Sequence, residues 1–365
     1  MIILSQQRKV DNMKVLLVGH DFDFSAGDGV SRYSYEIYKG ISKYVSAKTI
    51  TVGKLPRPVR AMLPITAKGY DIVHAMYPDV ARIAKGGAKM VTMWHDLRML
   101  SKYSAGTQAR YKPKLSERYG IANRIIKSWV DENYLNTDAL VTNSTKTLEE
   151  AVAYLKKEGI YSRRKIYRAI PLGIDEKFLH VNKWNGARRD FAFIGSIHLK
   201  HKNLFGLLSA FDGISGYPQA RAARLHIFTQ SAGARTILSS RLKAFPRLSH
   251  RNVILHVNMP DDAIIKMLPK FVACLHLSKE EGFGFPILES MAAGTRVILL
   301  KKASIPREVS KYAIKANENE IPEIAAGMID DSKPASSKAI QYAKSFTWGN
   351  TVKKTLEVYN KILEQ

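Results

Sequence analysis

Cysteine is nearly absent from this chain of 365 residues, which contains only Cys274. A single cysteine excludes a disulfide framework and favours a reducing, cytoplasmic compartment. Because Cys274 lies within an apolar run, we interpret it as a buried strand residue rather than a nucleophile. The sequence also has no apolar run of the ~20 residues that a membrane-spanning helix needs. Only Met1–Leu4 precede polar residues at the start, which does not fit a secretory signal.

Acidic residues are scarce: 32 stand against 57 basic ones, which gives a net charge of +25. The excess is spread over both halves of the chain and is densest in the basic region Arg98–Lys127. Apolar residues from Leu115 to Val130 recur there at helical spacing. A basic amphipathic helix suits an anionic membrane surface, and an ordinary domain helix with its apolar stripe in the core explains the pattern equally well.

Three kinds of motif are missing. The chain has no Asp-x-Asp motif in a plausible diphosphate loop, since Asp21 and Asp23 precede the first glycine loop. It has no GxGxxG dinucleotide fingerprint. It also lacks helix-turn-helix, zinc and RNA-stacking motifs, so a nucleic-acid-binding protein is the weaker alternative, resting on charge alone.

Short apolar runs alternate with helix and turn signals in both halves. The expected strands are Val15–Val18, Ile72–His74, Val91–Trp94, Ala139–Thr142, Phe191–Ile194, Leu225–Phe228, Val253–His256 and Ala273–Leu277. This alternation predicts an α/β fold of two Rossmann-like, doubly wound parallel-sheet domains facing across a cleft. The polar stretch Val181–Asp190 is the expected linker.

The segment Ser278–Leu300, SKEEGFGFPILESMAAGTRVILL, constrains function most. It reads as a glycine turn after one strand, then a short helix, then the strand Arg296–Leu300. Pro286 suits the start of the helix, Glu289 is expected in its first turn, and Gly294 is expected to end it. Such an order directs free backbone N–H groups and the positive end of a helix dipole at one place, which suits a diphosphate.

Two glutamates in this segment add a capacity for binding sugars. A carboxylate can accept a hydrogen bond from each hydroxyl of a vicinal diol. Glu289 could hold a ribose diol, and Glu281 could hold a hydroxyl of a sugar beyond the phosphates. A ribose, a diphosphate and a second sugar together make a nucleotide sugar.

Glu281 and Glu289, with seven residues between them, resemble the E-x7-E signature of group 1 glycosyltransferases, the retaining family four of the GT-B fold. The resemblance covers nearly the whole chain. It includes the segments Met13–His20, Gly27–Arg32, Asp71–His74, Thr92–Asp96, Asn143–Thr147, Ile170–Asp175, Phe193–Leu204, Ile305–Val309 and Phe346–Trp348. Their order and spacing make the match strong.

The resemblance implies an acceptor-side domain at 13–184, a nucleotide-sugar domain at 188–345, and a final helix, 346–365, that crosses back. It implies metal-independent, retaining transfer of a hexose from a UDP- or GDP-linked donor to a glycan or lipid-linked acceptor, with no cofactor. The implied catalytic residues are His95, Glu281 and Lys202. The implied donor-binding residues are Gly27, Gly29, Arg32, Ser196, Lys202, Gly282, Phe283, Gly284, Phe285, Leu288 and Glu289.

One position departs from the family pattern. Many relatives carry arginine directly after the glycine of the Phe193–Leu204 segment, where this chain has Ser196, which cannot supply a bidentate positive charge. His198, Lys200 or His201 could compensate, or Lys202 and the helix N-terminus could suffice. A GT-B-like nucleotide-sugar epimerase is a further alternative. Residues 1–12 precede the usual opening strand, as an extension or because Met13 is the true start.

Overall fold

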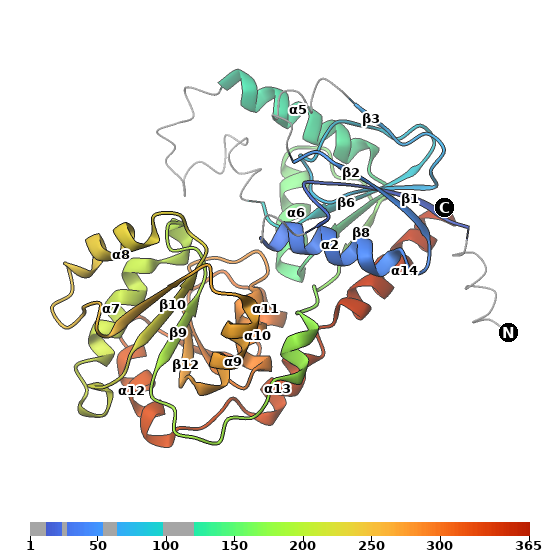
Figure 1. The fold of residues 1–365 in the computed structure, drawn as a ribbon. Helices are drawn as coiled ribbons and strands as arrows, with labels where there is room; N and C mark the ends of the chain where they lie inside the picture. Colours follow the sequence, from blue (N-terminus) through green and yellow to red (C-terminus); the bar gives the residue numbers. More distant parts are fainter. Residues whose placement is uncertain (1–11, 24–27, 54–63, 98–119) are drawn as a thin grey trace. The chain divides into compact units, whose positions relative to one another are not determined.

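A computed structural model describes residues 12–23, 28–53, 64–97 and 120–365. The chain forms two compact units (Figure 1). Unit 1 comprises the residues up to Gly173 together with Trp348–Gln365, and unit 2 comprises Ile174–Thr347. The first strand expected in each half, Val15–Val18 and Phe191–Ile194, is part of a parallel sheet. This agrees with the predicted fold class.

Unit 1 is built on a parallel sheet of six strands, in the order β2 (Ser46–Thr51), β1 (Lys14–Gly19), β4 (Ile72–Ala75), β6 (Lys89–Trp94), β7 (Ala139–Thr142) and β8 (Ile166–Ala169). A two-stranded sheet pairs β3 (Ile65–Thr66) with β5 (Ile83–Ala84). The helices within its described residues are α2 (Gly29–Ile41), α5 (Gly120–Asn136), α6 (Thr145–Lys157) and α14 (Trp348–Leu363). The four central strands are almost fully buried, as expected for parallel strands with helices on both faces.

The final helix is an integral part of unit 1. Helix α14 packs along α2 (Figure 1), where Val352 fills the space beside Gly40 so closely that a larger residue at Gly40 would clash. The hydroxyl of Tyr359 lies 2.6 Å from Nδ1 of His74 on β4. Residues 348–363 therefore join the first and last parts of the chain in one core.

Unit 2 contains a second parallel sheet, in the order β11 (Val253–Val257), β10 (Leu225–Thr229), β9 (Phe191–Ile194), β12 (Ala273–His276), β13 (Arg296–Leu300) and β14 (Ile314–Ala316). Its α-helices are α7 (Leu204–Ile214), α8 (Ala234–Leu242), α9 (Asp261–Met267), α10 (Phe285–Ala292), α11 (Arg307–Ser310), α12 (Ile321–Asp331) and α13 (Ser337–Lys344). Short 3₁₀ turns lie at η2 (Glu176–His180), η3 (Lys200–Lys202), η4 (Pro218–Ala220) and η5 (Leu268–Lys270). The sheet is doubly wound from β9, the first strand of the unit.

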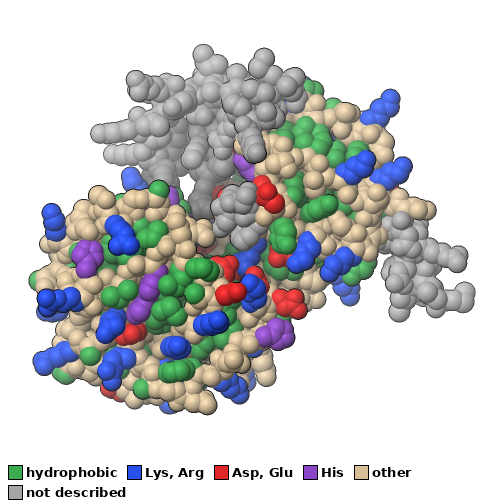
Figure 2. All heavy atoms as spheres, viewed as in Figure 1, with side chains coloured by type: hydrophobic (Ala, Val, Ile, Leu, Met, Phe, Trp, Pro, Cys, Tyr) green, Lys and Arg blue, Asp and Glu red, His purple; other side chains and the backbone are tan. Residues whose placement is uncertain are grey.

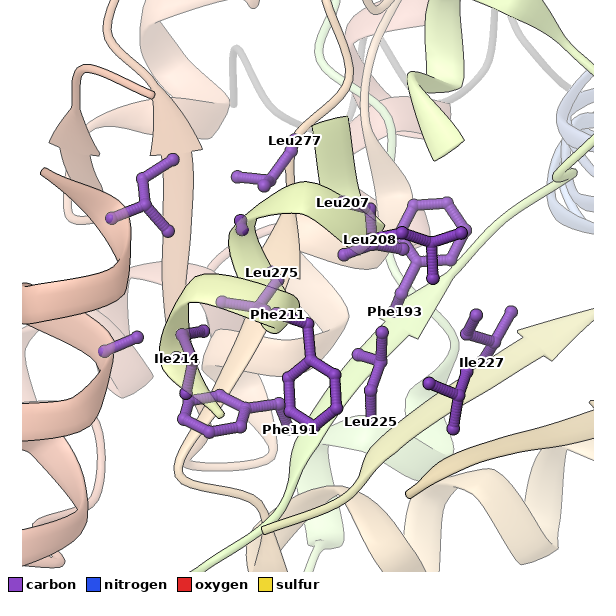
Figure 3. Packing of buried hydrophobic residues seen from close by; sticks show 14 of the residues in the cluster. Phe191, Phe193, Leu207, Leu208, Phe211, Ile214, Leu225, Ile227, Leu275 and Leu277 are labelled. Atoms are coloured by element: carbon purple, nitrogen blue, oxygen red, sulfur yellow. The ribbon is translucent and has the colours of Figure 1, made fainter. Parts of the chain in front are cut away.

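The core of unit 2 lies between this sheet and α7. Phe211 and Ile214 of α7 point towards Phe191 on β9 and Leu225 on β10 (Figure 3). All four side chains are fully buried. At about 1.5–3 kcal/mol for each large apolar side chain, this cluster holds the C-terminal half of α7 against β9 and β10.

The polar stretch Val181–Asp190 is not the boundary between the units, contrary to our expectation. The boundary falls earlier, at Gly173–Ile174. Arg188, only 6% exposed, donates from Nε to the carbonyl of Pro269 and from Nη1 to the carbonyl of Ser332. A buried guanidinium must satisfy its donors, and it does so here by fixing the stretch to unit 2.

Candidate active site

The candidate site of unit 2 lies where the direction of winding changes. Strands β9 and β12 are neighbours in the sheet but are separated in sequence, because the chain winds outwards from β9 in both directions. In doubly wound sheets, ligands bind beyond the carboxyl ends of the strands at such a switch point. Lys202 follows β9 and Glu281 follows β12, so the topology brings them to the same place.

Lys202 and Glu281 form a buried ion pair. The Nζ of Lys202 donates to Oε1 of Glu281 at 2.8 Å and to Oε2 at 3.0 Å. Nε2 of His276, the last residue of β12, lies 2.7 Å from Oε1 of the same carboxylate. The side chains of Lys202, Glu281 and His276 are 13%, 7% and 0% exposed.

Glu281 is ionised in this environment. Burial by itself would raise the pKa of its carboxyl group, but the charge and hydrogen bond of His276, followed by those of Lys202, hold that pKa far below its usual range. A buried carboxylate with two donors is stabilised in its charged form. The site therefore holds a fixed negative charge beside a lysine that carries the matching positive charge.

The turn after Glu281 leads into α10 as the sequence predicted. Gly284 adopts φ +102°, a conformation that side-chain-bearing residues rarely adopt, and Gly294 ends the helix region at φ +86°. Pro286 lies in the first turn of α10. Glu289 was expected in that first turn, but it lies further along because α10 already begins at Phe285, and it is 7% exposed.

The other residues of unit 2 that were predicted to bind the sugar donor differ in their exposure to solvent. Gly282 and Phe285 are partly exposed beside Glu281, and the ring of Phe283, 4% exposed, packs edge-on against Phe285 at 5.1 Å. Leu288 is fully buried. Its side chain belongs to the core, so it supports α10 and offers no surface to a ligand.

Ser196 is partly exposed just beyond β9. Among the candidates to replace the missing arginine, Nδ1 of His198 lies 3.0 Å from the hydroxyl of Ser231, and Lys200 is exposed. The backbone carbonyl of His201 accepts a hydrogen bond from Lys279. Lys202 is the lysine that the fold directs into the site.

In unit 1, His95 directly follows β6. Its Nε2 lies 3.0 Å from the carbonyl of Met76, its own carbonyl accepts a hydrogen bond from Asn143, and its ring meets the edge of Tyr33 at 5.0 Å. Burial lowers the pKa of His95, although Met76 and the carboxylates of Asp96 and Asp28 oppose that shift. The imidazole is therefore neutral at pH 7.

The start of α2 lies close to His95. Asp28 caps the helix by accepting a hydrogen bond from the backbone N–H of Ser31 at 2.8 Å. Gly29 is the exposed first residue of α2, and Arg32 is partly exposed one turn later. Gly27 lies outside the described residues.

The whole basic region Arg98–Lys127 also lies outside the described side chains. Just beyond it, Trp129 and Val130 of α5 are 3% and 2% exposed and pack with Trp94 and Leu140. These two apolar residues therefore belong to the core of unit 1, as the domain-helix interpretation predicts.

Sequence reasoning missed two buried histidines. His276 lies within an apolar run and reads as part of a strand; its position just before the acidic turn was the only signal. His74 lies between two tyrosines, with Nδ1 2.6 Å from the hydroxyl of Tyr359 and Nε2 3.3 Å from that of Tyr33. Burial, with a smaller contribution from His95, lowers the pKa of His74 to about 3.

Among the residues with described positions, no group of three or more histidine, cysteine or acidic side chains is arranged to hold a metal ion. Across the same ranges, no helix has the length and apolar character needed to span a bilayer. Cys274 is a buried, unpaired residue of β12, as predicted.

Comparison with known proteins agrees with this arrangement. Residues 188–330 match the family model "Glycosyl transferases group 1". The O-antigen chain mannosyltransferase B of Escherichia coli is 30% identical over 107 residues, which is 28% of each chain. The D-inositol 3-phosphate glycosyltransferase of Acidothermus cellulolyticus is 23% identical over 81% of this chain and 68% of its own.

Solved structures show the same fold. Sucrose-phosphate synthase from Thermosynechococcus elongatus matches with a TM-score of 0.70 and 14% identity, over 97% of this chain and 99% of its own. The pneumococcal O-GlcNAc transferase GtfA, solved with UDP and GlcNAc, matches with a TM-score of 0.54 and 14% identity, over 80% of this chain and 57% of its own.

Two doubly wound parallel-sheet units, with the last helix returned to the first unit, define the GT-B fold. The match of residues 188–330 and the longer alignment to a glycosyltransferase agree with the placement of Lys202 and Glu281 at the switch point. Residues 188–330 match the group 1 glycosyltransferases, and the chain is similar over most of its length to a glycosyltransferase.

Proposed function

We propose that this chain transfers a hexose from a UDP- or GDP-linked sugar to a glycan or lipid-linked acceptor, with retention at the anomeric carbon and without a metal. The observation that carries the proposal is the contact of Lys202 with Glu281 at the switch point of unit 2. It brings one lysine ammonium group and one carboxylate together just before α10, where a diphosphate and its sugar would need them.

The roles of the residues follow from their chemistry. Lys202 would neutralise the negative charge that develops on the leaving diphosphate, with help from the N-terminus of α10. Glu289 would accept hydrogen bonds from the ribose diol, and Glu281 from a hydroxyl of the transferred sugar. His95, neutral and beyond the carboxyl end of β6, would contact that sugar from unit 1.

The relatives support a hexose and leave the nucleotide base open. One relative is named a mannosyltransferase, and one similar structure was solved with UDP and GlcNAc. A panel of UDP-glucose, UDP-GlcNAc and GDP-mannose therefore covers the donors to test first.

The test is a transfer assay with each donor and a panel of simple sugar acceptors, with NMR of the product to read its anomeric configuration. We expect one donor to give a product of retained configuration, at an unchanged rate in the presence of a chelator. Lys202→Met should abolish transfer, whereas Lys243→Met, at an exposed lysine of the same unit, should leave it intact. Interconversion of the sugar without an acceptor would instead establish an epimerase.

The charge of the protein motivates a second part of the proposal, contact with an anionic membrane through the basic region. Lysine and arginine side chains are distributed over both units on the face shown in Figure 2. Neutralising Lys112, Lys114 and Arg118 should release the protein from vesicles that contain phosphatidylserine, without loss of activity on a soluble acceptor. Vesicle binding that survives the triple change would rule out this region as the contact.

A further inference from the structure

His276 is placed to act on Glu281 without touching a ligand. It ends β12, is completely buried and lies five residues before Glu281. Its Nε2 lies 2.7 Å from Oε1 of Glu281. The strand fixes the backbone of His276, and the core fixes its ring, so this hydrogen bond has little freedom to move.

The two ring nitrogens of His276 have different surroundings. Nδ1 is buried and has no hydrogen-bond partner among the described residues. An ionised carboxylate can only accept a hydrogen bond, so Nε2 carries a proton and is the donor. The Nε2–H of His276 therefore donates to the carboxylate from one side, and Lys202 donates to it from the other.

The two carboxylate oxygens are held unequally. Oε1 accepts from both His276 and Lys202, at 2.7 and 2.8 Å, whereas Oε2 accepts from Lys202 at 3.0 Å. If Lys202 turns towards another anion, Oε1 keeps a donor and Oε2 becomes available. In this geometry His276 is the permanent donor to Glu281, and Lys202 is the donor that can be exchanged.

We propose that His276 is a positioning residue that holds Glu281 in place through Oε1 while Lys202 moves to the donor diphosphate, which leaves Oε2 to accept a hydroxyl of the donor sugar. This inference rests on the proposed function, because it needs a diphosphate at Lys202. It assigns His276 a role in donor binding and turnover that its place in an apolar strand does not indicate.

The physical reason is the cost of an unpaired buried charge. Without His276, a diphosphate could recruit Lys202 only by leaving the carboxylate of Glu281, which is 7% exposed, without any charged or neutral donor from this cluster. Truncating one partner of a buried charged hydrogen bond is costly mainly because of the group left behind. His276 removes most of that cost.

The test compares His276→Leu, which removes the donor at similar volume, with His276→Gln, which retains an N–H. Nucleoside diphosphate affinity is measured by calorimetry, and turnover by the transfer assay. We expect His276→Leu to weaken nucleotide binding and to reduce kcat by about tenfold or more each, and His276→Gln to restore most of both. His250→Leu, at an exposed histidine of unit 2, is the matched control.

A double-mutant cycle separates positioning from general stability. In a Lys202→Met background there is no lysine to withdraw, so His276→Leu should no longer weaken nucleotide binding further. An equal loss of affinity in both backgrounds would overturn the proposal, as would wild-type affinity and kcat in a folded His276→Leu protein. Failure of the unmodified protein to bind any nucleotide would instead refute the proposed function itself.

Discussion

The Nζ of Lys202 lies 2.8 Å from Oε1 of Glu281, although the two residues are 79 positions apart in the chain. One follows the first strand of unit 2 and the other follows the fourth, which the winding of the sheet places beside it. The contact is buried, so forming it requires both charged groups to be desolvated, unlike an ion pair on the surface.

The first prediction concerns stability against pH. The pKa of Glu281 is depressed in the folded state, so its ionisation contributes stability that is complete above its unfolded value of ~4.3 and is lost as pH falls towards the folded value. Glu281→Gln leaves Lys202 buried without its counter-charge. At pH 7 we expect a loss of about 3 kcal/mol in the free energy of unfolding.

Urea unfolding of both proteins between pH 3 and pH 7 measures this difference. It should be constant from pH 7 to about pH 5 and should shrink below about pH 4, as the wild-type carboxylate loses its advantage. A difference that stayed the same down to pH 3 would show that the ionised carboxylate is not its source.

The second prediction concerns Glu289. If its carboxylate accepts the ribose diol, Glu289→Ala should weaken binding of the nucleoside diphosphate by about tenfold to a hundredfold, because charged hydrogen bonds contribute ~1.5–3 kcal/mol. Glu323→Ala removes an exposed carboxylate from α12 of the same unit and should change nothing. Calorimetric titration with UDP and GDP provides the comparison, and equal affinities in the two variants would remove Glu289 from the site.

The third prediction concerns the glycine turn. At Gly284, φ is +102° and an added Cβ would lie 3.0 Å from Cδ1 of Ile287. Gly284→Ala should therefore destabilise unit 2 by about 1–3 kcal/mol and weaken donor binding by displacing the start of α10. Gly327→Ala is the control: it lies inside α12 with open space around it, so alanine should be neutral or stabilise by up to ~1 kcal/mol. Equal changes in the thermal unfolding temperature of the two variants would contradict this account of the turn.

The fourth prediction concerns His95. Because burial depresses its pKa, His95 stays neutral as pH falls through the ordinary histidine value of ~6.5. Turnover that depends on neutral His95 should therefore stay level from pH 8 to below pH 6. His95→Ala should lower kcat by at least about a hundredfold, with little change in nucleotide affinity. A kcat that falls with an apparent pKa near 6.5 in the wild type, and not in the variant, would show that His95 titrates normally.

Burial decided which parts of the fold could be predicted from sequence. The bounds of β7, β9 and β13 match the apolar runs residue for residue, because strands covered on both faces read as continuous hydrophobic segments. The edge strands β2 and β8 were missed, since a half-exposed strand such as SAKTIT carries no such run. The unit boundary was misplaced because Arg188 makes a polar stretch part of a core.

The candidate site was predicted as a set of residues but not as a geometry. The resemblance singled out Lys202 and Glu281, and only the sheet order shows that they meet. His276 could not be recognised in advance, because a histidine in an apolar run has no local pattern that indicates a partner five residues away. The burial of the Leu288 side chain could not be predicted from the sequence either, since burial depends on packing between segments distant in the chain.

The most direct test of the central claim is calorimetric titration of the wild type, Lys202→Met and Glu289→Ala with UDP, GDP and their sugar conjugates. The account predicts that one nucleotide family binds the wild type and that each substitution weakens binding by about tenfold or more. Absence of binding by every nucleotide at millimolar concentration, or equal affinity in all three proteins, would contradict a donor site at the switch point of unit 2.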